Sequence, residues 1–154
     1  MRTAFRLLIL LFIVGLVIIQ FFQPEKNIAT ESPNHLFNQE QVPEDVSAML
    51  KSACLDCHSN QTNYQWYHQV APVSWFINNH IVEGKEELNL SNWGQMEILD
   101  KIAALEDMGK EIRNGKMPIT SYKLMHPKAI FSEQESQRLI EWTSSFSEQL
   151  LTGE

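Results

Sequence analysis

The sequence predicts an all-α protein, in which a small helical domain follows an N-terminal helix that spans a membrane. Three observations support this prediction. The first 22 residues are almost entirely apolar, and later segments repeat apolar residues every three or four positions. No segment alternates apolar and polar residues convincingly enough to predict more than minor strands. The 154 residues suit one compact domain and an accessory segment, which we place at 1–22 (anchor), 23–42 (linker) and 43–154 (domain).

The N-terminal segment has the composition of a membrane anchor. Arg2 and Arg6 precede the apolar run Leu7–Phe22, in which Gln20 is the one strongly polar side chain. A helix of this length measures about 24 Å, and Thr3–Phe5 with a snorkelling Arg6 extends it toward the roughly 30 Å of a hydrocarbon core. No small-residue cleavage site follows, which favours an uncleaved anchor over the alternative of a signal peptide. The basic start predicts a cytoplasmic N-terminus and an exported domain.

The segment after the anchor predicts a linker. Gln23–Val42 contains Pro24 and Pro33, several Asn, Gln and Glu residues, and little apolar periodicity.

The exported part is strongly acidic. From Gln23 onward there are 19 acidic residues and 10 Lys and Arg, a formal net charge of −9. This charge repels phosphate backbones, so we expect no binding to nucleic acid. It would suit a partner with a basic surface.

Four helices are expected in the domain. The first begins at Pro43-Glu44-Asp45, whose acids favour a helix N-terminus, and it ends at the cysteines. The second is predicted over Pro72–Val82, with Gly84 as its C-terminal stop. Apolar spacing from Ile98 predicts a third that closes at Asn114-Gly115, and a capping box at Ser132–Glu135 opens the last.

Both cysteines of the chain lie in Cys54-Leu55-Asp56-Cys57-His58. A thioredoxin-type pair would need a βαβ context and a helix N-terminus that lowers a thiol pKa, whereas this pair follows a helix. A structural zinc site needs four ligands, and His58 directly after Cys57 makes a shared tetrahedron awkward. Two unreactive core cysteines would leave the adjoining histidine unexplained.

A c-type haem explains all three residues. Thioether bonds from Cys54 and Cys57 to the two vinyl groups would hold one haem covalently, and the turn between them would place His58 on the iron as axial ligand. Covalent attachment spares a small domain from enclosing the whole cofactor. It takes place outside the cytoplasm, where the anchor would deliver this domain.

The second axial ligand is expected between Arg113 and Glu135, where Met117, Met125 and His126 occur. The Gly115–Pro118 segment resembles the Met-Pro loop that precedes the last helix of small c-type cytochromes, so Met117 is favoured. His126 is the main alternative. A further alternative is that Met117 only fills a gap in the core. We regard His35, His68 and His80 as less favourable candidates.

Several longer stretches resemble the bacterial haem-binding domain proteins, short anchored chains with a single C-x-x-C-H. These stretches are Gln20–Asn27, Cys54–Tyr67, Ala71–Leu88, Gly115–Pro127 and Ser132–Trp142. Gln65 stands where proline would be expected. The resemblance implies haem binding for electron transfer, and it matches both Met117 and His126.

The sequence therefore predicts a single-pass protein of the bacterial inner membrane with a periplasmic, cytochrome c-like domain. We expect haem iron that cycles between two oxidation states, which makes the protein an electron carrier for redox proteins not yet identified rather than an enzyme. A haem-based sensor or a peroxidase-like enzyme with a displaceable sixth ligand is the alternative. A zinc-dependent interaction module is a third possibility.

Overall fold

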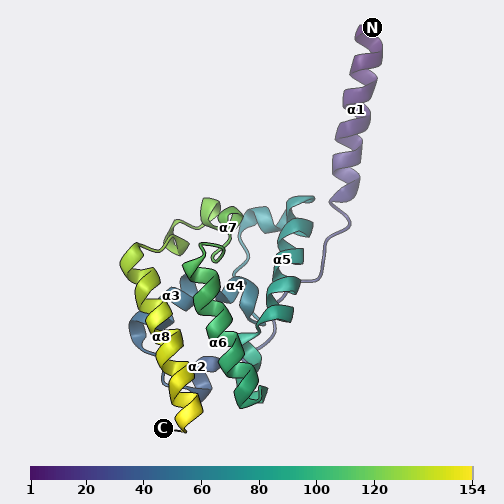
Figure 1. Cartoon of the computed structure of the whole chain (residues 1–154). Helices are drawn as coiled ribbons and strands as arrows, with labels where there is room; N and C mark the ends of the chain where they lie inside the picture. The colour runs from purple at the N-terminus through teal and green to yellow at the C-terminus, as the bar shows by residue number, and fades with distance from the viewer. Residues whose placement is uncertain (154) are drawn as a thin grey trace.

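The computed structural model describes residues 1–153 and confirms the all-α prediction (Figure 1). Among these residues, β-pairing is limited to one isolated bridge, between Ile28 and Gln61. Helix α1, Arg2–Ile19, projects from the domain and has a mean hydropathy of 2.4, so it is long and apolar enough to cross a membrane. None of its residues is buried in the protein.

The remaining helices form the domain. They are α2 (Leu36–Gln39), α3 (Glu44–Ala53), α4 (Leu55–His58), α5 (Val73–Glu87), α6 (Ile98–Arg113), α7 (Thr120–Met125) and α8 (Glu133–Thr152). Three short 3-10 helices connect them, namely η1 (Trp66–Gln69), η2 (Leu90–Gln95) and η3 (Pro127–Ala129).

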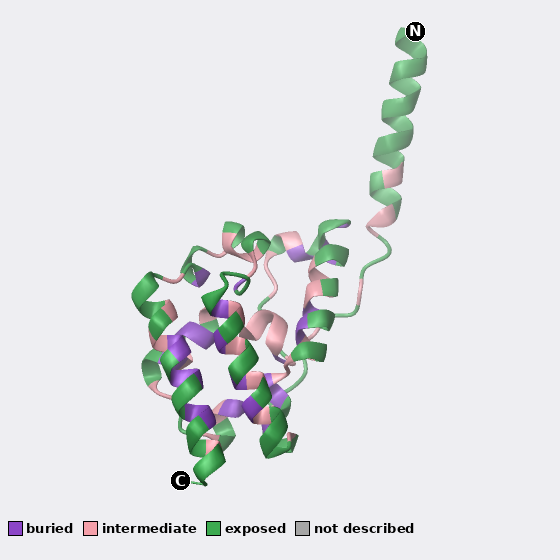
Figure 2. Ribbon diagram, in the orientation of Figure 1, coloured by how far each residue is buried: buried purple, intermediate pink, exposed green. Residues whose placement is uncertain are grey.

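The core lies between α3, α6 and α8. Helices α6 and α8 run side by side in opposite directions, and their buried faces meet (Figures 1 and 2). Leu50, Leu105 and Leu139 are fully buried at this junction. Each such side chain contributes roughly 1.5–3 kcal/mol by leaving water. Trp93 is also fully buried, stacks on Phe146 and donates from Nε1 to Glu40 Oε1 at 2.9 Å.

Part of the segment that we assigned to a linker folds onto the domain. Leu36 is only 1% exposed, and Phe37 and Val42 pack against the same core. The carbonyl of Asn34 accepts a hydrogen bond from Gly94 N at 2.8 Å. A few isolated apolar residues and polar contacts hold this segment, which explains why its sequence shows no helical periodicity.

Three helix boundaries agree with the sequence analysis. Helix α3 begins at Glu44 after Pro43, and α6 ends at Arg113 before Gly115, which has a φ of +68°. The capping box is present, because Ser132 Oγ accepts from Glu135 N and Ser132 N donates to Glu135 Oε2.

The predicted end of the second helix was wrong. Helix α5 continues through Gly84 to Glu87, and Gly84 is buried inside it. A Cβ at Gly84 would lie 2.9 Å from the carbonyl oxygen of Cys57, closer than real Cβ atoms come. This glycine therefore permits α5 to approach α4, rather than ending the helix.

Candidate functional site

The C-x-x-C-H motif forms a tight turn at the junction of α3 and α4. Cys54 interrupts the helix, with φ −120° and ψ −44°, and ends α3 by donating its N–H to Leu50 O. Its own carbonyl then accepts from Cys57 N at 3.1 Å and from His58 N at 2.9 Å. One turn of backbone therefore holds the two thiols and the imidazole in fixed order.

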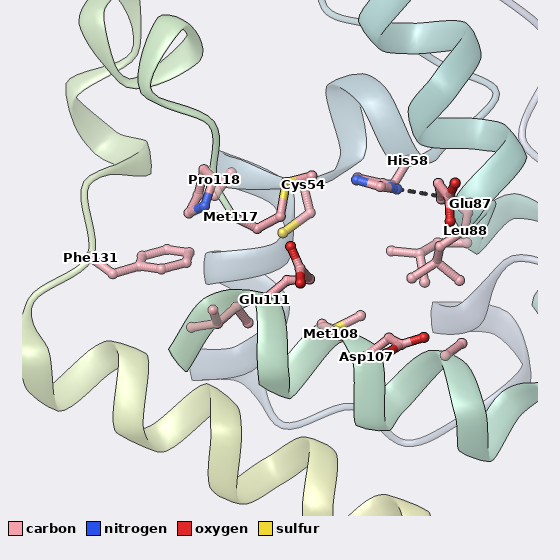
Figure 3. A pocket seen from close by; sticks show the side chains of 14 residues that line it. Cys54, His58, Glu87, Leu88, Asp107, Met108, Glu111, Met117, Pro118 and Phe131 are labelled. Carbon is pink, nitrogen blue, oxygen red and sulfur yellow. Dashed lines mark hydrogen bonds between the residues drawn. The ribbon is translucent and has the colours of Figure 1, made fainter. Parts of the chain in front are cut away.

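A cavity of about 340 Å³, here called the first cavity, lies beside this turn (Figure 3). Cys54, His58 and Met117 all line it, although Met117 lies on a distant loop. This volume falls in the range of small-molecule and cofactor pockets. Most of the remaining wall is apolar and is made by Ala53, Leu88, Leu90, Ala104, Met108, Ile112, Pro118 and Phe131.

The His58 ring is oriented by the backbone. Its Nδ1 lies 3.0 Å from the carbonyl oxygen of Leu88, at the end of α5 (Figure 3). A carbonyl can only accept, so Nδ1 carries the proton and Nε2 of the neutral ring keeps its lone pair. Nε2 points away from Leu88, toward the side where Cys54 lies. Histidines that bind metals are commonly held by such a bond.

Met117 reaches the first cavity because the loop after α6 folds back on that helix. The N–H groups of Lys116 and Met117 both donate to Glu111 O, at 3.0 and 3.2 Å. Met108 is a second thioether in the same wall, which the sequence analysis missed. The available signal was its position on α6, three residues after Leu105 and four before Ile112, both of which are buried.

His126 lies in a different place. It lines a second cavity of about 130 Å³, on the other side of the C-x-x-C-H turn, together with Cys57, His68 and Met125. Both of its ring nitrogens are engaged, Nδ1 with Tyr122 O at 3.1 Å and Nε2 with a tyrosine hydroxyl (Tyr67 Oη) at 3.2 Å. The ring also stacks on Tyr122, with centroids 3.8 Å apart.

The structure thus brings together three of the predicted site residues, Cys54, His58 and Met117, and places Cys57 and His126 in the second cavity. The family model described as the haem-binding domain matches residues 14–145. The chain belongs to this family. No curated protein and no solved structure matches the chain.

Haem binding is therefore the function that the family supports, and the first cavity suits a haem. A haem needs apolar walls for its ring and a nitrogen or sulfur ligand for its iron. The first cavity offers both, since Nε2 of His58 has no partner among the described residues and the thioether of Met117 lies in another part of the wall.

The two thiols do not have the properties of a reactive pair. Burial raises the pKa of Cys54 to about 12, and the neighbouring Cys57 adds to this effect. Burial and the Asp56 carboxylate raise the pKa of Cys57 to about 11. Both thiols therefore stay protonated near neutral pH, unlike the thiolates of redox enzymes. In residues 1–153 no three His, Cys, Asp or Glu side chains converge to hold a metal ion, which disfavours a zinc site.

The rim of the first cavity is acidic. Glu87, Asp107 and Glu111 line it, and none of the lining residues is Lys or Arg. Two of these acids have cations nearby, because Lys110 lies 3.6 Å from Asp107 and Lys116 lies 3.4 Å from Glu111. A haem held in this cavity would have three carboxylates in its surroundings, of which only Glu87 has no lysine partner among the described residues.

Proposed function

We propose that this protein is a membrane-anchored c-type cytochrome that carries single electrons. The observation that carries the proposal is the hydrogen bond from His58 Nδ1 to Leu88 O, which leaves Nε2 free beside the thiol of Cys54. A bound haem would supply the one-electron chemistry by cycling its iron between Fe(III) and Fe(II). The protein would supply two axial ligands, the covalent attachment and an apolar pocket.

Covalent attachment through Cys54 and Cys57 is supported by the geometry of the turn. Each thiol would add across one vinyl group, so that sulfur bonds to one carbon and the thiol hydrogen moves to the other, with no added oxidant. Residues three apart on a helical turn are neighbours. Cys57 can therefore provide the second thioether once its thiol turns from the second cavity to the first.

Met117 is our proposed distal ligand. It shares the first cavity with His58, whereas His126 would have to give up its bond to Tyr67 and leave its stack on Tyr122. A thioether ligand favours Fe(II) compared with a second imidazole and so raises the potential. This suits a protein that accepts electrons.

The anchor and the acidic rim suggest where the electrons go. We infer that α1 holds the domain on the periplasmic side of the bacterial inner membrane, since Arg2 and Arg6 precede the apolar helix. The acidic rim at the first cavity would attract a redox partner with a basic surface.

A sensor or a peroxidase-like enzyme is the second candidate, and one observation favours it. Met117 is 38% exposed and lies on a loop, so a ligand could displace it from the iron. Ready binding of carbon monoxide to the unmodified ferrous protein would support this candidate. An electron carrier, with both axial positions filled, should bind it poorly.

The test of the main proposal is expression of the full chain in a host that attaches haem c. The pyridine haemochrome spectrum should show one haem per chain, and the haem should stay with the polypeptide during denaturing electrophoresis. The double variant Cys54→Ala/Cys57→Ala should lose the haem under denaturing conditions. A colourless unmodified protein from that host would refute the proposal, and haem released by denaturation would refute covalent attachment.

A further inference from the structure

The residues that follow α1 are hydrogen-bonded to the start of α5 and to the residue before its N-cap. The Gln20 side chain makes two hydrogen bonds with Ala71, donating from Nε2 to its carbonyl at 3.0 Å and accepting from its N–H at 2.9 Å. The indole of Trp75 donates to Phe22 O at 2.6 Å. These hydrogen bonds place the C-terminal end of α1 next to the start of α5 (Figure 1).

Exposed apolar side chains gather on the same side of the domain. Trp66 is 74% exposed, Phe76 53% and Leu124 77%. They belong to η1, the first turns of α5, and α7, which surround the second cavity and are therefore neighbours. We call this surface the anchor-side face and define it as Trp66, Val70, Val73, Phe76, Leu124 and Met125.

The charge of this face differs from that of the rest of the domain. Residues 64–82, which include η1 and the start of α5, contain no Asp, Glu, Lys or Arg. Residues 115–131, which include α7, contain no acid and three lysines. Lys116 is paired with Glu111 at the first cavity, which leaves Lys123 and Lys128 for this face. The chain has 19 acidic residues, and all of them lie outside these two segments.

We propose that the anchor-side face rests on the bilayer that α1 crosses, with Trp66, Phe76 and Leu124 at the level of the lipid headgroups. This inference rests on the proposed membrane anchor. Aromatic side chains favour this interfacial depth, and lysines are attracted to anionic lipids. A lipid surface is favoured over a protein partner because α1 already holds this face at the end of the membrane-spanning segment.

This contact would set the orientation of the haem site. Helix α5 has 15 residues and is about 22 Å long. It starts at the anchor-side face and ends at Glu87, on the acidic rim of the first cavity. The Glu87 part of the rim would then lie away from the lipid, where a soluble redox partner can reach it.

The test uses the full chain in nanodiscs of phosphatidylethanolamine and phosphatidylglycerol. The photoreactive residue p-benzoylphenylalanine is placed, one position at a time, at Trp66 and Leu124. Matched controls carry it at Leu99 and Leu151, which are 76% and 64% exposed on other helices. A further position, Phe12 in the middle of α1, reports whether the anchor is inserted.

After illumination, mass spectrometry counts the chains that carry a lipid adduct. We expect adducts at Trp66 and Leu124 at least fivefold more often than at Leu99 and Leu151. Equal yields at all four positions, or crosslinks between two copies of the chain at Trp66 and Leu124, would overturn the inference while Phe12 still reacts with lipid. Absence of lipid adducts at Phe12 would refute the anchor itself, and the inference with it.

Discussion

The two cavities on either side of the C-x-x-C-H turn are lined by similar chemical groups, which differ in how far their hydrogen-bonding atoms are already paired. Each receives one cysteine of the motif, at least one histidine and a methionine. In the first cavity the hydrogen bond of the His58 ring to the rest of residues 1–153 is made through Nδ1, and Nε2 has no partner among these residues. In the second cavity both nitrogens of His126 are bonded, and its ring is stacked on Tyr122.

The difference shows that residue type alone does not identify a ligand. A group can bind a metal when its donor atom has no partner and faces open space, and His58 meets both conditions. In the second cavity the polar groups satisfy one another: Tyr122 donates to Asp56 Oδ2 at 2.8 Å, and Asp56 Oδ1 accepts from Asn63 N. Burial and the nearby Asp56 carboxylate raise the pKa of the Tyr122 phenol, so this hydroxyl keeps its proton and remains a donor to Asp56. We therefore interpret this hydrogen-bond network as one that stabilises the fold rather than one that binds a metal.

The largest difference is expected between two alanine variants, one at His58 and one at His126. His58→Ala should remove the proximal ligand and convert the absorption spectrum of the iron from low-spin to high-spin, with most of the haem lost during maturation. His126→Ala should leave the spectrum and the haem content unchanged, because it removes only the bonds to Tyr67 and Tyr122. Visible absorption and haem content per chain measure both.

The opposite pattern would contradict the comparison between the cavities. If His126→Ala opened the iron to carbon monoxide while Met117→Ala did not, the site would be bis-histidine. The haem would then have to reach into the second cavity, and our distal ligand would be wrong.

The next effect concerns the two methionines of the first cavity. Met117→Ala should abolish the weak sulfur-to-iron charge-transfer band at the red end of the spectrum of the oxidised protein. It should also lower the potential by on the order of 0.1 V, because the thioether that stabilises Fe(II) is lost. Met108→Ala is the matched control and should keep the band. A band that survives in Met117→Ala and disappears in Met108→Ala would assign the ligand to α6.

Much of the fold could be predicted from the sequence because its signals are local. The apolar run of α1, the acidic start of α3 and the capping box of α8 each follow from a few adjacent residues. The ligand candidates Met117 and His126 were equally visible as residue types, whereas Met108 was missed. Which candidate lies in which cavity could not be predicted, because it depends on contacts between distant residues. One example is the contact of Tyr67 with His126, which are 59 positions apart. Gly84 was misjudged for the same reason, since its partner Cys57 lies on another helix.

A smaller effect, on stability, is expected from a substitution at Gly84, where α5 contacts the C-x-x-C-H turn. Gly84→Ala would place a methyl group 2.9 Å from the Cys57 carbonyl oxygen, a backbone atom that cannot move freely. We expect a loss of about 1–3 kcal/mol in the free energy of unfolding, typical of overpacking. The control is Asn79→Ala on the exposed side of α5, which should change stability by no more than about 0.5 kcal/mol. Denaturant unfolding of the haem-loaded protein measures both. An unchanged midpoint for Gly84→Ala would show that α4 and α5 can separate.

The smallest predicted effect tests the acidic rim, which lines only the first cavity. Asp107 and Glu111 have lysines within 4 Å, whereas no ion pair involves Glu87 among the described residues. Its charge should therefore act on the haem with less compensation. Glu87→Gln removes a negative charge that favours Fe(III), so the potential should rise, by about 10–30 mV at low salt. Glu86→Gln, one residue earlier and not in the cavity wall, should shift it less. Because salt screens exposed charges, the difference between the two variants should shrink at high ionic strength. Equal shifts in both variants would mean that the potential responds to the net charge of the domain. The acidic rim would then have no stronger effect on the haem than other surface carboxylates.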